Sequence, residues 1–322
     1  ALWREEPEHR REIAARLGWL DVPAAMRPEA AGLVWFAREA RREGFTHALL
    51  LGMGGSSLAP EVLRRVLGTG AGGLDLAVLD TTDPAQIRAA ESRAEPARTL
   101  VVVSSKSGST IEVDSLFRRC HAATGGQGGR FVAITDPGTA LDRLAVVEGF
   151  RKVFRNPPDI GGRYSALSFF GLVPAALLDA DPGRLLDAAV DAMRRCGPDA
   201  PLAENPGLTL GAFLGVSALA GRDKLTLVLD PRLEALGLWV EQLLAESTGK
   251  DGKGIVPVAG ETLGPPEAYG PDRAFVSVAL EGEPSETAAR LRELEKAGHP
   301  VHRIAMARPH ELGAQFFIVF RE

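Results

Sequence analysis

Short apolar runs alternate with amphipathic stretches along most of the chain. The first set of runs covers residues 47–51, 74–79, 100–103, 131–135 and 152–154. Segments of roughly ten residues with helical spacing lie between them, residues 60–67 and 111–121 among them. Strands that are apolar along their whole length and separated by helices are typical of a parallel sheet covered on both faces. The pattern predicts a doubly wound α/β domain.

A second, less regular set of runs follows in the C-terminal half. It covers residues 225–229, 255–258, 274–280 and 301–305, again with helices between. Two helices over residues 2–17 and 28–42 precede the first set, and three prolines interrupt residues 196–206. We therefore predict an N-terminal domain over residues 1–199, helices included, and a second α/β domain over residues 200–322. The sequence alone does not show whether the two halves are a duplication.

Composition narrows the class of protein. The chain has 322 residues, 45% of them hydrophobic and 25% charged, which is ordinary for a globular protein with a core. A net charge of -5 argues against binding to nucleic acid. No run approaches the ~20 apolar residues of a membrane helix, and no signal peptide opens the chain. Cys120 and Cys196 have no partners at metal-ligand spacing, so we expect reduced cysteines, no metal and a cytoplasmic location.

The candidate chemistry lies in the loops after the predicted strands, because ligands of parallel sheets bind beyond the carboxyl ends of the strands. The first such loop, residues 52–57, contains Gly54, Gly55 and Ser56. Glycine lets backbone N–H groups approach a ligand closely, although many glycine-rich turns are only turns. The loop lacks the third glycine of the dinucleotide fingerprint, but Asp80 ends the second strand where a ribose-binding acid would lie. A nucleotide-linked dehydrogenase therefore stays open as an alternative.

The loop after the third strand, residues 104–110, is richer in hydrogen-bond donors. It carries five hydroxyl side chains and a lysine, among them Ser105, Lys106, Ser107 and Thr110. It runs directly into a predicted helix, and a helix N-terminus preceded by a glycine turn favours an anion the size of a phosphate. We expect this loop to cradle a phosphate group.

Gly162 and Arg163 form a third candidate segment. Two consecutive glycines before the arginine give a tight backbone approach, and a guanidinium is a permanent cation whose fixed donors suit an oxyanion or a phosphate. An ordinary surface arginine is the alternative for this segment taken alone.

The fourth segment is a helix predicted to begin at Asp230, as N-cap, with Pro231 in its first turn and a break at Gly249. Gln242 and Glu246 are four residues apart and share a face of this helix. Glu246 lies in the last turn, where the helix dipole favours the protonated form of a carboxyl group. A carboxylate with raised proton affinity suits a general base.

Taken together and in this order, the four segments resemble those of glucose-6-phosphate isomerases. The resembling residues are Gly52-Met53-Gly54-Gly55-Ser56, Ser105-Lys106-Ser107-Gly108-Ser109-Thr110-x-Glu112, Gly161-Gly162-Arg163-Tyr164-Ser165 and Gln242-x-x-x-Glu246-Ser247-x-Gly249-Lys250. The resemblance spans residues 45–257 and is closest to the bacterial form that is sometimes fused to a transaldolase. It implies two sugar-isomerase (SIS-type) α/β domains with flanking helices.

The resemblance also implies an activity. Glucose 6-phosphate and fructose 6-phosphate would be interconverted through an enediolate, in glycolysis and gluconeogenesis, without metal or organic cofactor. Glu246 would move the proton, Arg163 would stabilise the enediolate oxygen, and Gln242 would line the sugar pocket. The substrate-binding residues implied are Gly54, Gly55, Ser56, Ser105, Lys106, Ser107, Thr110 and Gly162. The expected partner is a small sugar phosphate rather than nucleic acid or a membrane, and the family is usually dimeric, so a homodimer is expected.

Two features of the family have no counterpart in this sequence. The Gly-Thr-Asn-Gly-Gln-His segment that carries the ring-opening histidine is not matched, and residues 260–269 stand where it would be sought. His299, His302 and His310 are candidate substitutes, each expected instead to be a surface or strand-end residue. The family's closing segment with its active-site lysine is absent too, so we expect an incomplete C-terminal end. The missing N-terminal methionine suggests an excised piece.

A second function class stays open beside the isomerase. A non-catalytic regulator of the same fold would bind a sugar phosphate through residues 104–110 but would not need the helix that carries Gln242 and Glu246. The presence of that helix favours the isomerase.

Overall fold

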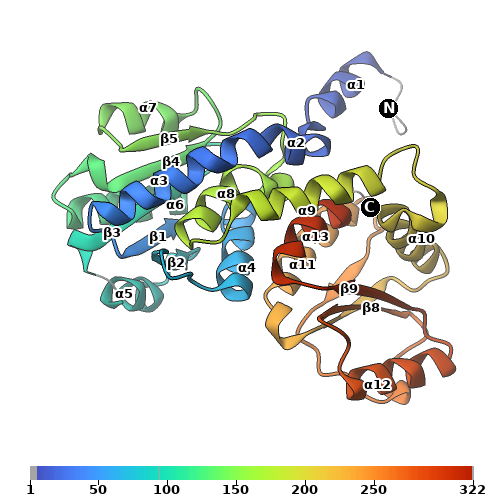
Figure 1. Cartoon of the computed structure of the whole chain (residues 1–322). Helices are drawn as coiled ribbons and strands as arrows, with labels where there is room; N and C mark the ends of the chain where they lie inside the picture. The colour runs from blue at the N-terminus through green and yellow to red at the C-terminus, as the bar shows by residue number, and fades with distance from the viewer. Residues whose placement is uncertain (1–5, 94, 321–322) are drawn as a thin grey trace. The chain divides into compact units, whose positions relative to one another are not determined.

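The protein divides into two compact units, residues 1–186 and 187–322, each built on one parallel sheet (Figure 1). The computed structural model describes residues 6–93 and 95–320. The division falls within helix α9 (Pro182–Arg195), whereas the sequence predicted a boundary at residues 199 and 200. Part of the first predicted helix, residues 2–5, lies outside the described residues; α1 covers Pro7–Ala14.

The first unit contains a five-stranded sheet in the order β2-β1-β3-β4-β5, with every neighbouring pair parallel. Its strands are β1 (His47–Leu51), β2 (Asp75–Leu79), β3 (Thr99–Ser104), β4 (Phe131–Thr135) and β5 (Lys152–Arg155). The three central strands are buried on both faces, as their continuous apolar sequences predict.

Helices cover both faces of this sheet (Figure 1). On one face, Phe117 of α6 contacts Phe131 of β4 edge-to-face, with ring centroids 5.5 Å apart. On the other, Phe36 meets Phe154 of β5 at 5.1 Å in the same geometry. The predicted doubly wound sheet is confirmed. Besides α1 and α9, the helices of this unit are α2 (Val22–Met26), α3 (Ala30–Arg42), α4 (Leu58–Leu67), α5 (Pro84–Ser92), α6 (Ile111–Ala123), α7 (Ala140–Val147) and α8 (Phe169–Leu177).

The second unit contains a four-stranded parallel sheet in the order β7-β6-β8-β9. Its core packs α12 against one face, where Leu291 and Leu294 meet Phe275 of β8. Trp239 and Phe316 join α11 to α13 with ring centroids 4.9 Å apart. The elements are β6 (Lys224–Leu229), β7 (Val256–Val258), β8 (Arg273–Leu280), β9 (Val301–Met306), α10 (Pro206–Leu219), α11 (Leu236–Thr248), α12 (Ser285–Lys296) and α13 (Leu312–Phe320).

All nine apolar runs are strands, but one predicted helix is wrong at its start. Asp230 caps a separate 3-10 turn, Pro231–Leu233, by accepting the N–H of Arg232, and α11 begins only at Leu236. The Arg232 guanidinium also bonds to the Asp230 carboxylate, which holds the chain in this turn.

The two sheets share their strand order. The second unit's order β7-β6-β8-β9 matches β2-β1-β3-β4 of the first, with the first strand of each unit in the second place. The sequence alone did not show this correspondence, because the loops and helices of the two halves differ. In the first sheet the chain passes from β1 to β2 on one side and then to β3 on the other side of β1. The second sheet repeats this with β6, β7 and β8. The carboxyl ends of β1 and β6 therefore lie at topological switch points.

The backbones of two loops touch at the carboxyl edge of the first sheet. Gly55, in the 3-10 turn Gly54–Ser56 after β1, lies against the carbonyl group of Gly162, so that a Cβ atom at Gly55 would overlap it. The Ser165 hydroxyl reinforces this approach by donating to the carbonyl oxygens of Gly162 at 2.7 Å and of Gly55 at 3.3 Å. Glycine at position 55 is therefore a packing requirement.

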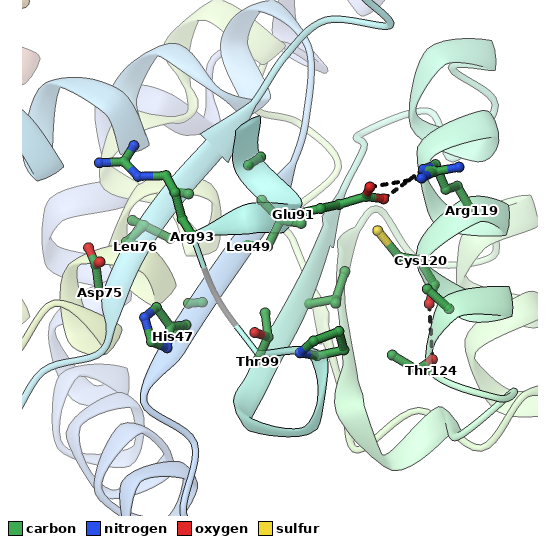
Figure 2. Close-up of a pocket in the computed structure, with 16 residues that line it drawn as sticks. His47, Leu49, Asp75, Leu76, Glu91, Arg93, Thr99, Arg119, Cys120 and Thr124 are labelled. Carbon is green, nitrogen blue, oxygen red and sulfur yellow. Dashed lines mark hydrogen bonds and ion pairs between the residues drawn. The ribbon is translucent and has the colours of Figure 1, made fainter. Parts of the chain in front are cut away.

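A cavity of about 230 Å³ lies between α5 and α6, at the opposite end of the strands (Figure 2). Its polar lining includes His47 and Thr99, the first residues of β1 and β3, and an ion pair between Arg119 and Glu91. Figure 2 shows the Cys120 thiol beside this pair. None of the residues predicted to bind substrate lines the cavity.

Burial should make Cys120 a slow nucleophile. Its side chain is buried among apolar residues, which raises the pKa of the thiol to about 11 from an ordinary value near 9.0. Two pK units leave roughly a hundredfold less thiolate at about pH 8, so we expect iodoacetamide to alkylate Cys120 about a hundredfold more slowly in the native protein than in urea. Peptide mass mapping over a time course measures both rates, and equal rates would contradict the prediction.

Substitution of Gly55 should cost stability through steric overlap. The added methyl group of Gly55→Ala meets backbone rather than a flexible side chain, so we expect the free energy of unfolding to fall by about 1–3 kcal/mol. Gly162→Ala is the matched control, because a Cβ there has no heavy atom within 4 Å and the φ angle is not left-handed. Urea unfolding followed by circular dichroism compares the two, and equal stability would show that the loops can separate without cost.

Candidate functional site

The loop after β3 is organised around the hydroxyl group of Ser105. The Ser105 Oγ atom lies 3.0 Å from Oγ1 of Thr110 and accepts the backbone N–H of Gly108 at 3.2 Å. Gly108 has a φ of 65°, a left-handed conformation that glycine adopts without strain. The hydrogen bonds close the loop on itself, so that its backbone curves around a small space.

Helix α6 starts directly from this loop. Thr110 is its N-cap residue, but the Thr110 side chain makes no capping hydrogen bond and contacts Ser105 instead. The first N–H groups of a helix have no partner within the helix, so those of α6 are directed toward the loop as potential anion donors. Ser107 is exposed and accepts both the N–H and the hydroxyl of Ser109. The N–H groups at the start of α6 and the hydroxyl groups of the loop are candidate donors to an anion such as phosphate.

The first unit brings three of the four predicted segments together. Ser104, the last residue of β3, donates its hydroxyl to the carbonyl oxygen of Ser56 at 3.1 Å. Gly55 of the same turn contacts Gly162. We call residues 104–110 the cradle loop. The turn after β1 therefore connects the cradle loop to the segment that carries Arg163.

Aromatic stacking supports Arg163. Its guanidinium carbon lies 4.8 Å from the centre of the Tyr164 ring, within the range of a cation–π contact. The Tyr164 ring in turn stacks on Trp19, with centroids 5.5 Å apart and planes 18° from parallel. Arg163 is half-buried and belongs to the 3-10 helix Gly162–Leu167.

Lys106 has a partner that the sequence analysis missed. Its ammonium group forms an ion pair with the carboxylate of Asp136, the first residue after β4, and donates to the carbonyl oxygen of Pro158 at 3.1 Å. The Asp136 side chain is 15% exposed, and burial raises the pKa of its carboxyl group while Lys106 opposes the rise. An acidic residue directly after a parallel strand was the available signal, but Asp136-Pro137-Gly138 also fits an ordinary turn.

The fourth segment lies in the second unit. Gln242 and Glu246 lie about one turn apart on α11, half-buried and exposed respectively, so they share a face as predicted. Lys250 donates its ammonium to the carbonyl oxygen of Glu246 at 2.8 Å, and Thr248 accepts the N–H of Ile255 at 2.9 Å. These bonds end the helix and fold the following loop back on it.

The three candidate histidines are not simple surface residues. His299 is buried next to Phe275 and just precedes β9, and burial lowers the pKa of His302, which packs against Phe213. His310 lies half-buried in a 3-10 turn before α13. The expectation of a surface or strand-end position holds for His299 and His302, which lie at the start of β9, although His299 is buried and His302 is half-buried.

The described residues contain neither a cluster of metal ligands nor a membrane-spanning helix. Within residues 6–93 and 95–320, no three His, Cys, Asp or Glu side chains gather as a metal would require. No helix in the same part of the chain is both long and apolar enough to cross a membrane.

Several glucose-6-phosphate isomerases are similar to this chain in sequence. A glucose-6-phosphate isomerase of Rubrobacter xylanophilus is 36% identical over 238 residues, which cover 69% of this chain and 54% of the relative. One from Prochlorococcus marinus is 34% identical, covering 65% of this chain and 41% of the relative. The chain thus spans about half the length of the curated relatives it matches.

Solved structures share the fold. A protein of Thermus thermophilus, described as hypothetical, superposes with a TM-score of 0.80 at 26% identity, covering 97% of this chain and 86% of that one. A glucose-6-phosphate isomerase of Chlamydia trachomatis gives 0.72 at 21% identity, covering 91% and 67%. The tagatose-6-phosphate ketose/aldose isomerase of Escherichia coli gives 0.57 at 14%, covering 97% and 91%, so the sugar-isomerase fold is shared beyond recognisable sequence similarity.

The family model described as phosphoglucose isomerase matches residues 37–260, which include all four candidate segments. The chain therefore belongs to the phosphoglucose isomerase family.

Proposed function

We propose that the protein is a glucose-6-phosphate isomerase, which interconverts glucose 6-phosphate and fructose 6-phosphate. The observation that carries the proposal is the continuous family match over residues 37–260, which contains both the anion cradle after β3 and the Gln242–Glu246 face of α11. A sugar-phosphate regulator needs the cradle alone. The helix and the names of the relatives favour the enzyme.

The phosphate group of the substrate occupies the cradle in this proposal. Hydroxyl groups of Ser105, Ser107 and Thr110, with the N-terminus of α6, donate to its oxygens. Lys106 belongs to the same loop and is paired with Asp136, and Ser56 is joined to the loop by the hydroxyl of Ser104. Donors held by mutual hydrogen bonds before the ligand arrives cost little ordering entropy on binding.

The chemistry is a proton transfer between two adjacent carbons of the open-chain sugar. In the aldose-to-ketose direction, Glu246 removes the proton from C2, giving an enediolate, and returns it to C1, while the hydroxyl proton of O2 is transferred to O1. Negative charge develops on the enediolate oxygen of the substrate. Arg163, kept in place by Tyr164, stabilises that charge. Gln242 contacts the sugar beside the base. Glu246 is an exposed residue in the last turn of α11.

The cellular setting follows the family. We propose a homodimer that works in the cytoplasm on a small sugar phosphate, in glycolysis and gluconeogenesis. The same proposal includes a similarity to the isomerases that are fused to a transaldolase. Size-exclusion chromatography with light scattering tests whether the protein is a dimer.

Replacement of the base should abolish exchange at carbon. In D₂O, fructose 6-phosphate incubated with the protein is expected to give glucose 6-phosphate deuterated at C2, seen by proton NMR. Loss of a general base costs about 10²–10⁴-fold, so Glu246→Gln should be silent on the same timescale. Glu241→Gln, earlier on α11 and also exposed, is the matched control and should exchange as the unchanged protein does. Equal exchange by Glu246→Gln would remove Glu246 as the base, and tight binding without exchange by the unchanged protein would favour the regulator.

The open space beside Gly162 gives a separate test of the binding site. A methyl group there meets no protein atom, so Gly162→Ala should fold normally. If the sugar occupies this space, the methyl group obstructs it, and we expect the KM for fructose 6-phosphate to rise roughly tenfold. Steady-state kinetics measures the change, with Gly129→Ala as the control because its Cβ is equally free of contacts. An unchanged KM would place the sugar elsewhere.

A further inference from the structure

The strongest unexplained feature near the cradle is the partner of Lys106. Lys106 belongs to the loop after β3, Asp136 to the loop after β4 and Pro158 to the segment after β5. One ammonium group therefore connects three successive loops at the carboxyl edge of the sheet. Two of these loops are also joined by a backbone bond from the Asp136 N–H to the Lys106 carbonyl oxygen at 3.3 Å.

The ion pair is only partly exposed to water. The Lys106 and Asp136 side chains are 28% and 15% exposed. A charged hydrogen bond in such surroundings is stronger than an exposed ion pair, because water competes less for both groups. The second carboxylate oxygen of Asp136 is buried and has no hydrogen-bond partner among the described residues. The carboxylate therefore depends on Lys106 for its stabilisation.

We propose that Asp136 is a positioning residue of the phosphate cradle: it fixes the ammonium group of Lys106 against the loop after β5 and so sets where that charge meets the anion. The inference rests on the proposed function, since it assigns Asp136 to the site that binds the sugar phosphate. Asp136 itself bears the same charge as the ligand, so it acts through Lys106 and not by contact with the phosphate.

Two charged groups act on the Asp136 carboxyl. Burial raises its pKa most, Lys106 lowers it, and Asp159, from the segment after β5, raises it. Asp142 and Arg155 form their own pair nearby, and the pKa of Asp142 is lowered. As the pH falls toward the raised pKa of Asp136, its protonation breaks the ion pair that fixes Lys106, and under this proposal the loss of positioning lowers the anion affinity of the cradle although a like charge is removed.

Sulfate is the probe that isolates this effect. It resembles a phosphate group but stays a dianion over the whole range from about pH 4.5 to 7.5, whereas a phosphate monoester titrates near pH 6. Sulfate affinity, measured by calorimetry, is expected to be about tenfold weaker in Asp136→Asn than in the unchanged protein at the upper end of this range. The difference should shrink as the pH falls, because the unchanged protein loses the carboxylate charge that the variant already lacks.

A double-mutant cycle separates positioning from folding. If Asp136 acts through Lys106, Asp136→Asn has no further effect on sulfate affinity when Lys106→Met is already present, even if both variants are less stable. Glu91→Gln, which breaks the ion pair with Arg119 at the other end of the strands, is the matched control and should bind sulfate normally.

These measurements distinguish failure of the positioning role from failure of the proposed isomerase function. Unchanged or tighter sulfate binding by Asp136→Asn, or additive effects in the cycle, would overturn the positioning role while the isomerase proposal stands. Failure of the unchanged protein to bind sulfate would overturn the cradle and the positioning role together. In the substrate reaction we expect Asp136→Asn to raise KM and to leave kcat within about twofold, as loss of uniform binding does.

Discussion

The candidate site depends on one steric constraint, the contact between the turn after β1 and the carbonyl group of Gly162. A side chain at residue 55 would push these backbones apart, and the Ser165 hydroxyl would lose one of the two carbonyl groups that it bridges. Through Ser104 the same turn is tied to the cradle loop. Three segments far apart in the sequence thereby share one rigid edge, and a site whose donors are fixed in advance binds an anion without paying for their ordering.

Most of the fold could be predicted from local pattern. Buried parallel strands are apolar on both faces, so each of the nine runs stands out without knowledge of its neighbours. Strand order is a different matter, since it depends on which crossovers pack together. The start of α11 was misjudged for a related reason. Asp230 and Pro231 are a good helix start, but Arg232 bonds to Glu281 and to the Leu280 carbonyl oxygen. These two long-range bonds, together with the local bond to Asp230, favour a separate turn.

Those parts of the candidate site could be predicted in which the type of residue and its spacing indicate a chemical role. A loop of hydroxyl groups before a helix indicates an anion, and Gln242 and Glu246 are on one face because they are four residues apart. Asp136 was not predictable in this way. Its role depends on an ammonium group thirty residues earlier in the chain, and a carboxylate beside an expected phosphate looks unfavourable until its partner is known. Similarly, the burial of His299 could not be predicted from its neighbours in the sequence, because Phe275 of another strand packs against it.

The shared strand order of the two units has a consequence for stoichiometry. β8 occupies the place of β3, yet the loop after β8 carries Glu281 and Glu283 where the first unit has serines and a lysine. Both carboxylates are paired with arginines, Glu281 with Arg232 and Glu283 with Arg303, and Glu283 also accepts the hydroxyl of Ser277. Within residues 6–93 and 95–320, the shared strand order thus carries a loop of hydroxyl groups and a lysine in one unit and a loop with two paired carboxylates in the other, so the proposed function assigns one sugar phosphate to each chain.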